Sequence, residues 1–344
     1  MRDRRGPVRR KGGSVLTDAD EAQALPGRRT TRPRWVTDGG LETDLIFHHG
    51  VDLPGFAAYP LLETAEGRAL LSQYYAGFAQ VASRAGAGLL LETPTWRASA
   101  DWVVALGGVR SDVRRINLES VLFLAGLAEN LISDGVSPGG AAGFDGSGRG
   151  PDVRVCGVLG PRGDGYIAGD PTSADEFGDY HWAQIAAFAQ SGVARVTAYT
   201  LTTVAEAVGV VQAARAQGVA VAVSFTVETD GRLPDGTPLG EAIESLRLQA
   251  APDDLLVNCA HPSHIAAALT PEAAWTDHVT GLRVNASRQS HAELDDAAEL
   301  DEGDIVDLVT EHERLAARLP RLDIVGGCCG TDVRHVAALW GVDV

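Results

Sequence analysis

The feature that most constrains the fold is a regular alternation of two sequence patterns that begins at Trp35. Short apolar runs rich in β-branched residues end in Gly, Asn, Thr or Cys, and longer stretches with helical spacing of Ala, Leu and Val separate them. The short runs predict eight strands, at 35–38, 88–92, 153–159, 195–199, 219–226, 255–258, 279–284 and 323–325. The longer stretches predict helices at 63–85, 112–131, 174–190, 203–216, 262–269, 302–319 and 331–339.

Strands that alternate with helices and are apolar throughout indicate a parallel sheet covered on its faces. Eight such units in one domain predict an α/β fold, a closed TIM-type (β/α)8 barrel with eight parallel strands. A doubly wound open sheet is the alternative, and it normally carries a Gly-rich phosphate turn after an early strand. Asp38-Gly39-Gly40 is not GxGxxG, and the sequence contains no P-loop motif.

Charge is distributed unevenly in a chain whose net charge is −17. Residues 1–34 hold ten basic and four acidic residues, so this segment carries +6 and the rest carries −23. We expect a disordered basic extension at 1–34 and a barrel domain at 35–344. So acidic a barrel should repel nucleic acid and anionic membranes, and the sequence has no run of 18 apolar residues that would span a bilayer.

These features favour a cytoplasmic protein with reduced thiols, either a monomer or a homodimer. Three stretches are irregular and rich in Gly, Pro or Asp. The Gly-rich residues 134–152 predict a surface loop. Residues 160–181 and 228–240 each follow a predicted strand, so they are candidate lids over an active site.

The chain has four cysteines, and the position of three of them indicates a metal site. Cys259 ends the sixth predicted strand, and Cys328 and Cys329 follow the eighth. The carboxyl ends of these strands can face one another across the barrel mouth, where three thiolates would suit Zn²⁺ and leave a fourth position open. The flanking glycines would allow the turn that brings both adjacent cysteines to one ion. The alternative, a buried thiol packed as a small apolar group, is favoured for Cys156.

Three motifs resemble the hallmarks of a known family. TDGGLET at 37–43, VNCAHP at 257–262 and VGGCCGT at 325–331 are similar to motifs of the zinc-dependent homocysteine S-methyltransferases. LETPTWRAS at 91–99 lies where that family has a Thr/aromatic motif on the second strand. The resemblance runs from about Trp35 to the carboxyl terminus.

The resemblance implies a (β/α)8 barrel in which Cys259, Cys328 and Cys329 hold the zinc. Asp38 matches the residue that contacts the amino group of homocysteine, and Gly39 and Gly40 would bring backbone close to the substrate. The further substrate-binding positions that we expect are Glu42, Thr93, Trp96, Tyr199, Asn258 and Asn285.

Two positions depart from the family pattern. Tyr199 stands where the family typically has a Glu that helps to bind the substrate amine, and a tyrosine carries no charge at pH 7. Either Asp38, Glu42 or Glu92 compensates, or the acceptor is not quite homocysteine. Trp96 stands where a smaller aromatic residue is usual, and it either holds a cationic methyl donor on its face or packs under a loop.

The expected reaction is methyl transfer from an onium donor to the zinc-bound thiolate of L-homocysteine, which gives methionine. S-methylmethionine, S-adenosylmethionine and a betaine are the candidate donors, so the partners are a small-molecule thiol acceptor and a methyl donor. We expect no catalytic group beyond the zinc-activated thiol. Two alternatives stay open, the same chemistry on another thiol or selenol and a non-catalytic zinc-binding barrel. A Schiff-base aldolase is excluded because the sole lysine, Lys11, lies in the basic segment.

Overall fold

The computed structural model describes residues 33–133, 152–270 and 273–344. In this part of the chain eight parallel strands close into a barrel in chain order, which confirms the predicted TIM-type fold. Most of the predicted basic extension and of the predicted Gly-rich loop lies outside the described residues. The strands are β1 (Trp35–Val36), β2 (Gly88–Glu92), β3 (Val153–Leu159), β4 (Arg195–Leu201), β5 (Val221–Phe225), β6 (Asp254–Ala260), β7 (Gly281–Val284) and β8 (Ile324–Gly327).

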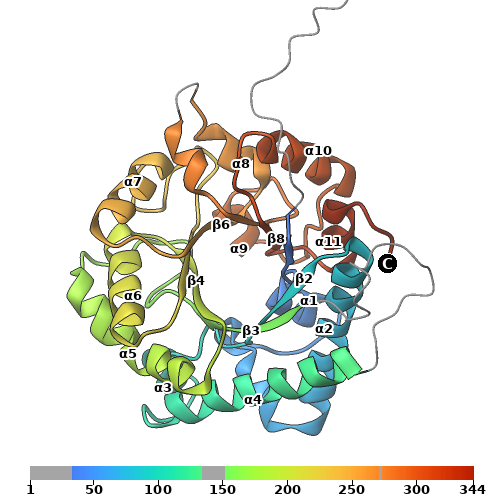
Figure 1. The fold of residues 1–344 in the computed structure, drawn as a ribbon, viewed down its shortest axis with the longest axis vertical. Coiled ribbons are helices and arrows are strands. Elements are labelled where there is room, and N and C mark those ends of the chain that lie inside the picture. Colours follow the sequence, from blue (N-terminus) through green and yellow to red (C-terminus); the bar gives the residue numbers. More distant parts are fainter. Residues whose placement is uncertain (1–32, 134–151, 271–272) are drawn as a thin grey trace, which may run out of the picture.

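Helices surround the barrel (Figure 1). Those of the described residues are α1 (Leu41–Phe47), α2 (Ala65–Ala85), α3 (Ala100–Ala105), α4 (Asp112–Ser133), α5 (Ala174–Ser191), α6 (Val204–Ala216), α7 (Leu239–Gln249), α8 (Pro262–Ala267), α9 (His291–Asp295), α10 (Ile305–Ala316) and α11 (Val333–Trp340). In the view of Figure 1, α1 and α9 lie inside the outer ring of helices. All seven predicted helices are present, whereas α1, α3, α7 and α9 were not predicted. Among the described helices, none is long and apolar enough to cross a membrane.

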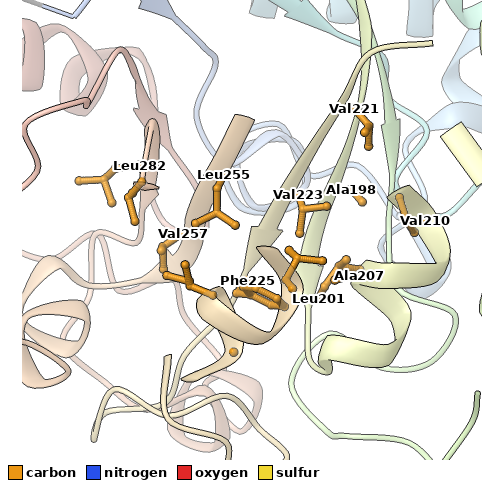
Figure 2. Packing of buried hydrophobic residues seen from close by; sticks show 14 of the residues in the cluster. Ala198, Leu201, Ala207, Val210, Val221, Val223, Phe225, Leu255, Val257 and Leu282 are labelled. Atoms are coloured by element: carbon orange, nitrogen blue, oxygen red, sulfur yellow. The ribbon is translucent and has the colours of Figure 1, made fainter. Parts of the chain in front are cut away.

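The core lies between the strands and the surrounding helices. Figure 2 shows Val223 and Phe225 of β5 beside Leu201 of β4, with Ala207 and Val210 of α6 packed against them. These side chains are excluded from solvent, which explains why the strands read as continuous apolar runs.

Strands β4 and β6 are irregular where they reach the mouth of the barrel. The register shifts between Ala198 and Leu201 in β4 and between Asn258 and Ala260 in β6. Next to each shift a residue other than glycine has a left-handed backbone, Thr200 with φ of 62° and Cys259 with φ of 56°. Both strands continue two residues past their predicted ends. The strained backbone at Thr200 and at Cys259 changes the direction of the side chain there.

Candidate active site

Three cysteines come together at the carboxyl end of the barrel. Cys259 belongs to β6, and Cys328 and Cys329 lie in the turn between β8 and α11. Their three Sγ atoms lie within 4.8 Å of one another, and those of Cys259 and Cys329 are 3.4 Å apart. Sulfur atoms this close can all be ligands of one tetrahedral ion, so the cluster is consistent with a metal site.

The turn that carries the cysteine pair lies directly on the turn that follows β1. Gly40 donates its N–H to the Thr331 carbonyl at 2.9 Å. A Cβ at Gly40 would lie 2.5 Å from the Cys328 carbonyl oxygen, and one at Gly39 would lie 2.7 Å from that of Thr331. The two glycines therefore permit a backbone contact that fixes the position of the cysteine pair.

Asn258 connects the ends of three neighbouring strands to the cysteines. Its Oδ1 accepts hydrogen bonds from Thr200 N at 2.9 Å and from Ser224 Oγ at 2.7 Å. Its Nδ2 donates to Thr200 Oγ1 at 2.9 Å and to Cys328 Sγ at 3.7 Å. Asn258 therefore holds the left-handed residue of β4 in place and supports a sulfur atom of the cluster.

The stretch 160–181 brings a tyrosine to the cluster that the sequence reading missed. The Tyr166 hydroxyl lies 3.1 Å from Cys259 Sγ and 3.3 Å from Cys329 Sγ. Its ring stacks on His291, with the ring centroids 4.1 Å apart. His291 Nε2 donates to the Cys259 carbonyl at 2.6 Å, and Nδ1 lies 2.9 Å from a Glu228 oxygen. Two loops and α9 thus enclose the strained cysteine of β6.

Hydrogen bonding within the cluster favours a thiolate. Hydrogen bonds from the Cys259 and Cys329 thiols hold the pKa of Cys328 well below the usual thiol value, against the effect of burial. The same contacts raise the pKa of Cys259, because a proton on that sulfur is held between its neighbours. A site that concentrates negative charge on sulfur suits a bound cation.

A cavity of about 330 Å³ opens above the cysteines. All three cysteines line it, together with eight of the expected substrate-binding residues, Asp38, Gly39, Gly40, Glu42, Thr93, Trp96, Tyr199 and Asn258. Asn285 is buried outside the lining, and its backbone N–H donates to the Ala260 carbonyl at 3.1 Å.

A buried arginine of β7, which the sequence reading did not include, lies between two of the expected carboxylates. Arg283 Nη2 lies 2.6 Å from Asp38 Oδ1, and Nη1 donates to Glu92 Oε2 at 2.6 Å. Nε donates to the Gly327 carbonyl and Nη2 to the Gly39 carbonyl, both at 2.8 Å. The guanidinium group therefore holds the ends of β1, β2 and β8 together.

Tyr199 and a second arginine complete this network inside the barrel. The Tyr199 hydroxyl donates to both Glu92 oxygens, at 2.7 Å and 2.8 Å, and its ring faces the Arg283 guanidinium at 4.7 Å. Arg195 Nη2 lies 3.9 Å from Glu92 Oε1, and Arg195 Nη1 lies 2.9 Å from Asp254 Oδ2. The Glu92 carboxylate is consequently surrounded by groups of the protein itself.

Two carboxyl groups of the cavity titrate near neutrality. Burial raises the pKa of Asp38 to about 7, although the nearby Arg283 lowers it. Burial likewise raises the pKa of Glu42 to about 7. Both groups can therefore change charge at physiological pH.

Comparison with known proteins identifies the family. The family model for homocysteine S-methyltransferases matches residues 35–341. The chain belongs to the homocysteine S-methyltransferase family. Membership supports methyltransferase activity for this chain. A search of the curated proteins finds no match.

Solved structures agree on the fold. Residues of this chain superpose on the homocysteine methyltransferase MmuM from Escherichia coli in its metallated form with a TM-score of 0.66 at 21% identity, covering 90% of this chain and 96% of that one. The oxidised form of the same protein gives a TM-score of 0.66 at 20% identity with the same coverage.

The two residues expected to depart from the family pattern, Tyr199 and Trp96, both line the cavity. The ring of Tyr199 lies beside the guanidinium of Arg283. At the mouth, the Arg97 guanidinium lies between the rings of Trp96 and Trp102, 3.8 Å from each centroid. One face of Trp96 is therefore already covered by a cation of the protein.

Proposed function

We propose that the chain is a zinc-dependent S-methyltransferase that moves a methyl group from an onium donor to L-homocysteine and gives methionine. The observation that carries this proposal is the group of three cysteine sulfurs, within 4.8 Å of one another, on the lining of a cavity of about 330 Å³. The cavity is large enough for a small thiol and part of its donor. Residues Cys259, Cys328 and Cys329 would hold the ion.

Cys259, Cys328 and Cys329 would hold a zinc ion that could accept a substrate sulfur as a further ligand, and the bound metal would keep that sulfur deprotonated although a free thiol has a pKa of about 8.5. That sulfur would then attack the methyl carbon of the donor in line. The new S–C bond forms as the bond from the methyl group to the onium atom breaks, and its electron pair stays on the donor. The thiol would lose its proton to solvent as it binds the metal, and the methyl transfer itself releases none, so that step needs no general base.

The chain's own residues position the reactants. Asn258 and the contact between the two turns fix Cys328, and His291 fixes the peptide of Cys259. The Tyr166 hydroxyl, 3.1 Å and 3.3 Å from two of the sulfurs, can donate to them and temper their negative charge. Such pre-organisation lowers the entropic part of the barrier.

The charge of the cavity supports a cationic donor. Seven acidic side chains line it, Asp38, Glu42, Glu92, Asp164, Asp295, Glu299 and Asp301, against two arginines, Arg97 and Arg283. Asp38 and Glu92 pair with Arg283, which leaves five acidic groups against Arg97. An excess of negative charge raises the local concentration of a cation. S-methylmethionine, S-adenosylmethionine and a betaine all carry the onium group that this wall would attract.

The test combines metal content with turnover. Homocysteine is crossed with each of the three donors, methionine is measured by mass spectrometry, and zinc is measured on the same protein. Changing Cys259, Cys328 or Cys329 to Ser should abolish stoichiometric zinc and methionine formation together. Cys156→Ala is the matched control, because this buried thiol lies outside the cavity lining, and it should keep both. Full activity in a variant of the three cysteines would refute the proposed site.

A further inference from the structure

The acceptor region of the cavity contains a cation that belongs to the protein. Arg283 lines the cavity with Cys328, and its side chain is only 10% exposed. An arginine has five N–H groups, and the described residues accept three of those of Arg283, at Gly327, Gly39 and Glu92. Nη2 also lies 2.6 Å from Asp38 Oδ1, so one N–H group of this buried, cavity-lining guanidinium, on Nη1, has no oxygen partner among the described residues and can donate to a ligand.

The carboxylates that would bind an ammonium group are largely neutralised by this arginine. Glu92 is 2% exposed, and its oxygens accept from Tyr199 and Arg283. Asp38 Oδ1 accepts no hydrogen bond within the described residues, but Arg283 Nη2 lies 2.6 Å from it. A second cation bound at Asp38 would lie beside the first, and the repulsion would offset most of the attraction.

We propose that this site recognises its acceptor through a carboxylate and not through an amino group. Its acceptors are then mercaptoalkanoates as a chemical class, and homocysteine binds through the carboxylate that it shares with them. Arg283 is the specificity-determining residue, because the buried guanidinium both fills the place of an ammonium group and offers an N–H donor on Nη1 to an anion. The inference rests on the proposed transfer of a methyl group to a thiol at the three cysteines.

Three thiols of matched length test the proposal. Homocysteine, 4-mercaptobutanoate (no amino group) and 3-aminopropane-1-thiol (no carboxylate) are titrated into the full chain loaded with cobalt(II). The thiolate-to-cobalt absorption band reports binding without turnover. We expect 4-mercaptobutanoate to bind within about threefold of homocysteine and the aminothiol to bind about tenfold more weakly or worse, since one hydrogen bond to a charged group is worth that much.

Variants assign the effect to Arg283. Arg283→Met should weaken the binding of 4-mercaptobutanoate by about tenfold or more, so that its affinity becomes similar to that of the aminothiol. Arg283→Lys keeps the positive charge and should keep the order of affinities. Arg195→Met is the matched control, because Arg195 contacts the same Glu92 but does not line the cavity, and it should leave the order unchanged. If Arg283→Met does not fold, the wild-type titration and Arg283→Lys still decide the question.

The outcomes separate this inference from the proposed function. Tighter binding of the aminothiol than of 4-mercaptobutanoate would overturn the inference, even if homocysteine is methylated. Glu42 would then be the carboxylate that binds the amino group. The expected order of binding without methyl transfer from any donor would sustain the inference and refute the proposed reaction.

Discussion

Two tyrosines that donate to the same glutamate allow the strength of the buried network to be measured. The Tyr199 hydroxyl donates to the Glu92 carboxylate at 2.7 Å and 2.8 Å, whereas the Tyr75 hydroxyl donates to the Glu92 backbone carbonyl at 2.7 Å. Both tyrosines are buried, at 4% and 1% exposure. Tyr199→Phe and Tyr75→Phe therefore remove the same atom from comparable surroundings, and only the charge of the acceptor differs.

The expected cost follows from the partners that remain. After Tyr199→Phe, the ion pair that remains at Glu92 Oε1 is the one with Arg195, 3.9 Å away, so this oxygen loses its close donor. We expect a loss of about 1.5–3 kcal/mol in the free energy of unfolding, as for hydrogen bonds to charged groups. Tyr75→Phe should cost about 0.5–1.5 kcal/mol, the range for a neutral pair.

Equilibrium unfolding in urea measures both values. The midpoint should fall further for Tyr199→Phe, and the dependence on urea should stay unchanged in both variants because neither alters the surface exposed on unfolding. Equal costs, or a larger cost for Tyr75→Phe, would refute the view that the Glu92 charge depends on the tyrosine hydroxyl.

Three further predictions address the turns and helices. Gly40→Ala places a Cβ 2.5 Å from the Cys328 carbonyl oxygen, so zinc affinity measured by chelator competition should fall together with stability. Gly209→Ala, at the close contact of α6 with α5, should lower stability by about 1–3 kcal/mol in urea unfolding and leave zinc affinity unchanged. Burial raises the pKa of Asp332, but hydrogen bonds from His335 and Arg334 outweigh this effect and hold the pKa below its usual range. This carboxylate stabilises the fold above its unfolded pKa of about 4, so the stability deficit of Asp332→Asn should shrink as pH falls below that value.

The sequence predicts the fold well because burial on both faces makes the strands apolar. All eight strands and the seven longer helical patterns are found, and the errors are instructive. Strands β4 and β6 end late because Thr200 and Cys259 adopt left-handed backbones, which neither residue type signals. Helix α7 begins at Leu239 without a capping side chain, after a stretch rich in Gly, Pro and Asp. Local pattern alone cannot mark such a start.

The three cysteines and eight of the substrate-binding residues expected from the motifs line one cavity, but the motifs did not predict the role of Arg283. A charged residue within the apolar run 279–284 is itself a signal of an interior partner. Its partners Asp38 and Glu92 lie 245 and 191 positions away in the chain, and no local pattern relates them. The contact of Tyr166 with the cysteines could not be predicted for the same reason, because a loop brings this residue to positions distant in the chain.

The charges inside the barrel alternate along five side chains, Asp254, Arg195, Glu92, Arg283 and Asp38. This arrangement constrains how such a site can change during evolution. Replacing Arg283 alone leaves the buried Asp38 without its counterion, which is more damaging than replacing both together. An evolutionary change from this cavity to one whose carboxylates are free to bind a substrate should therefore require two substitutions together. A mutant library that varies positions 92, 199 and 283 jointly would recover active combinations that single-site scanning misses.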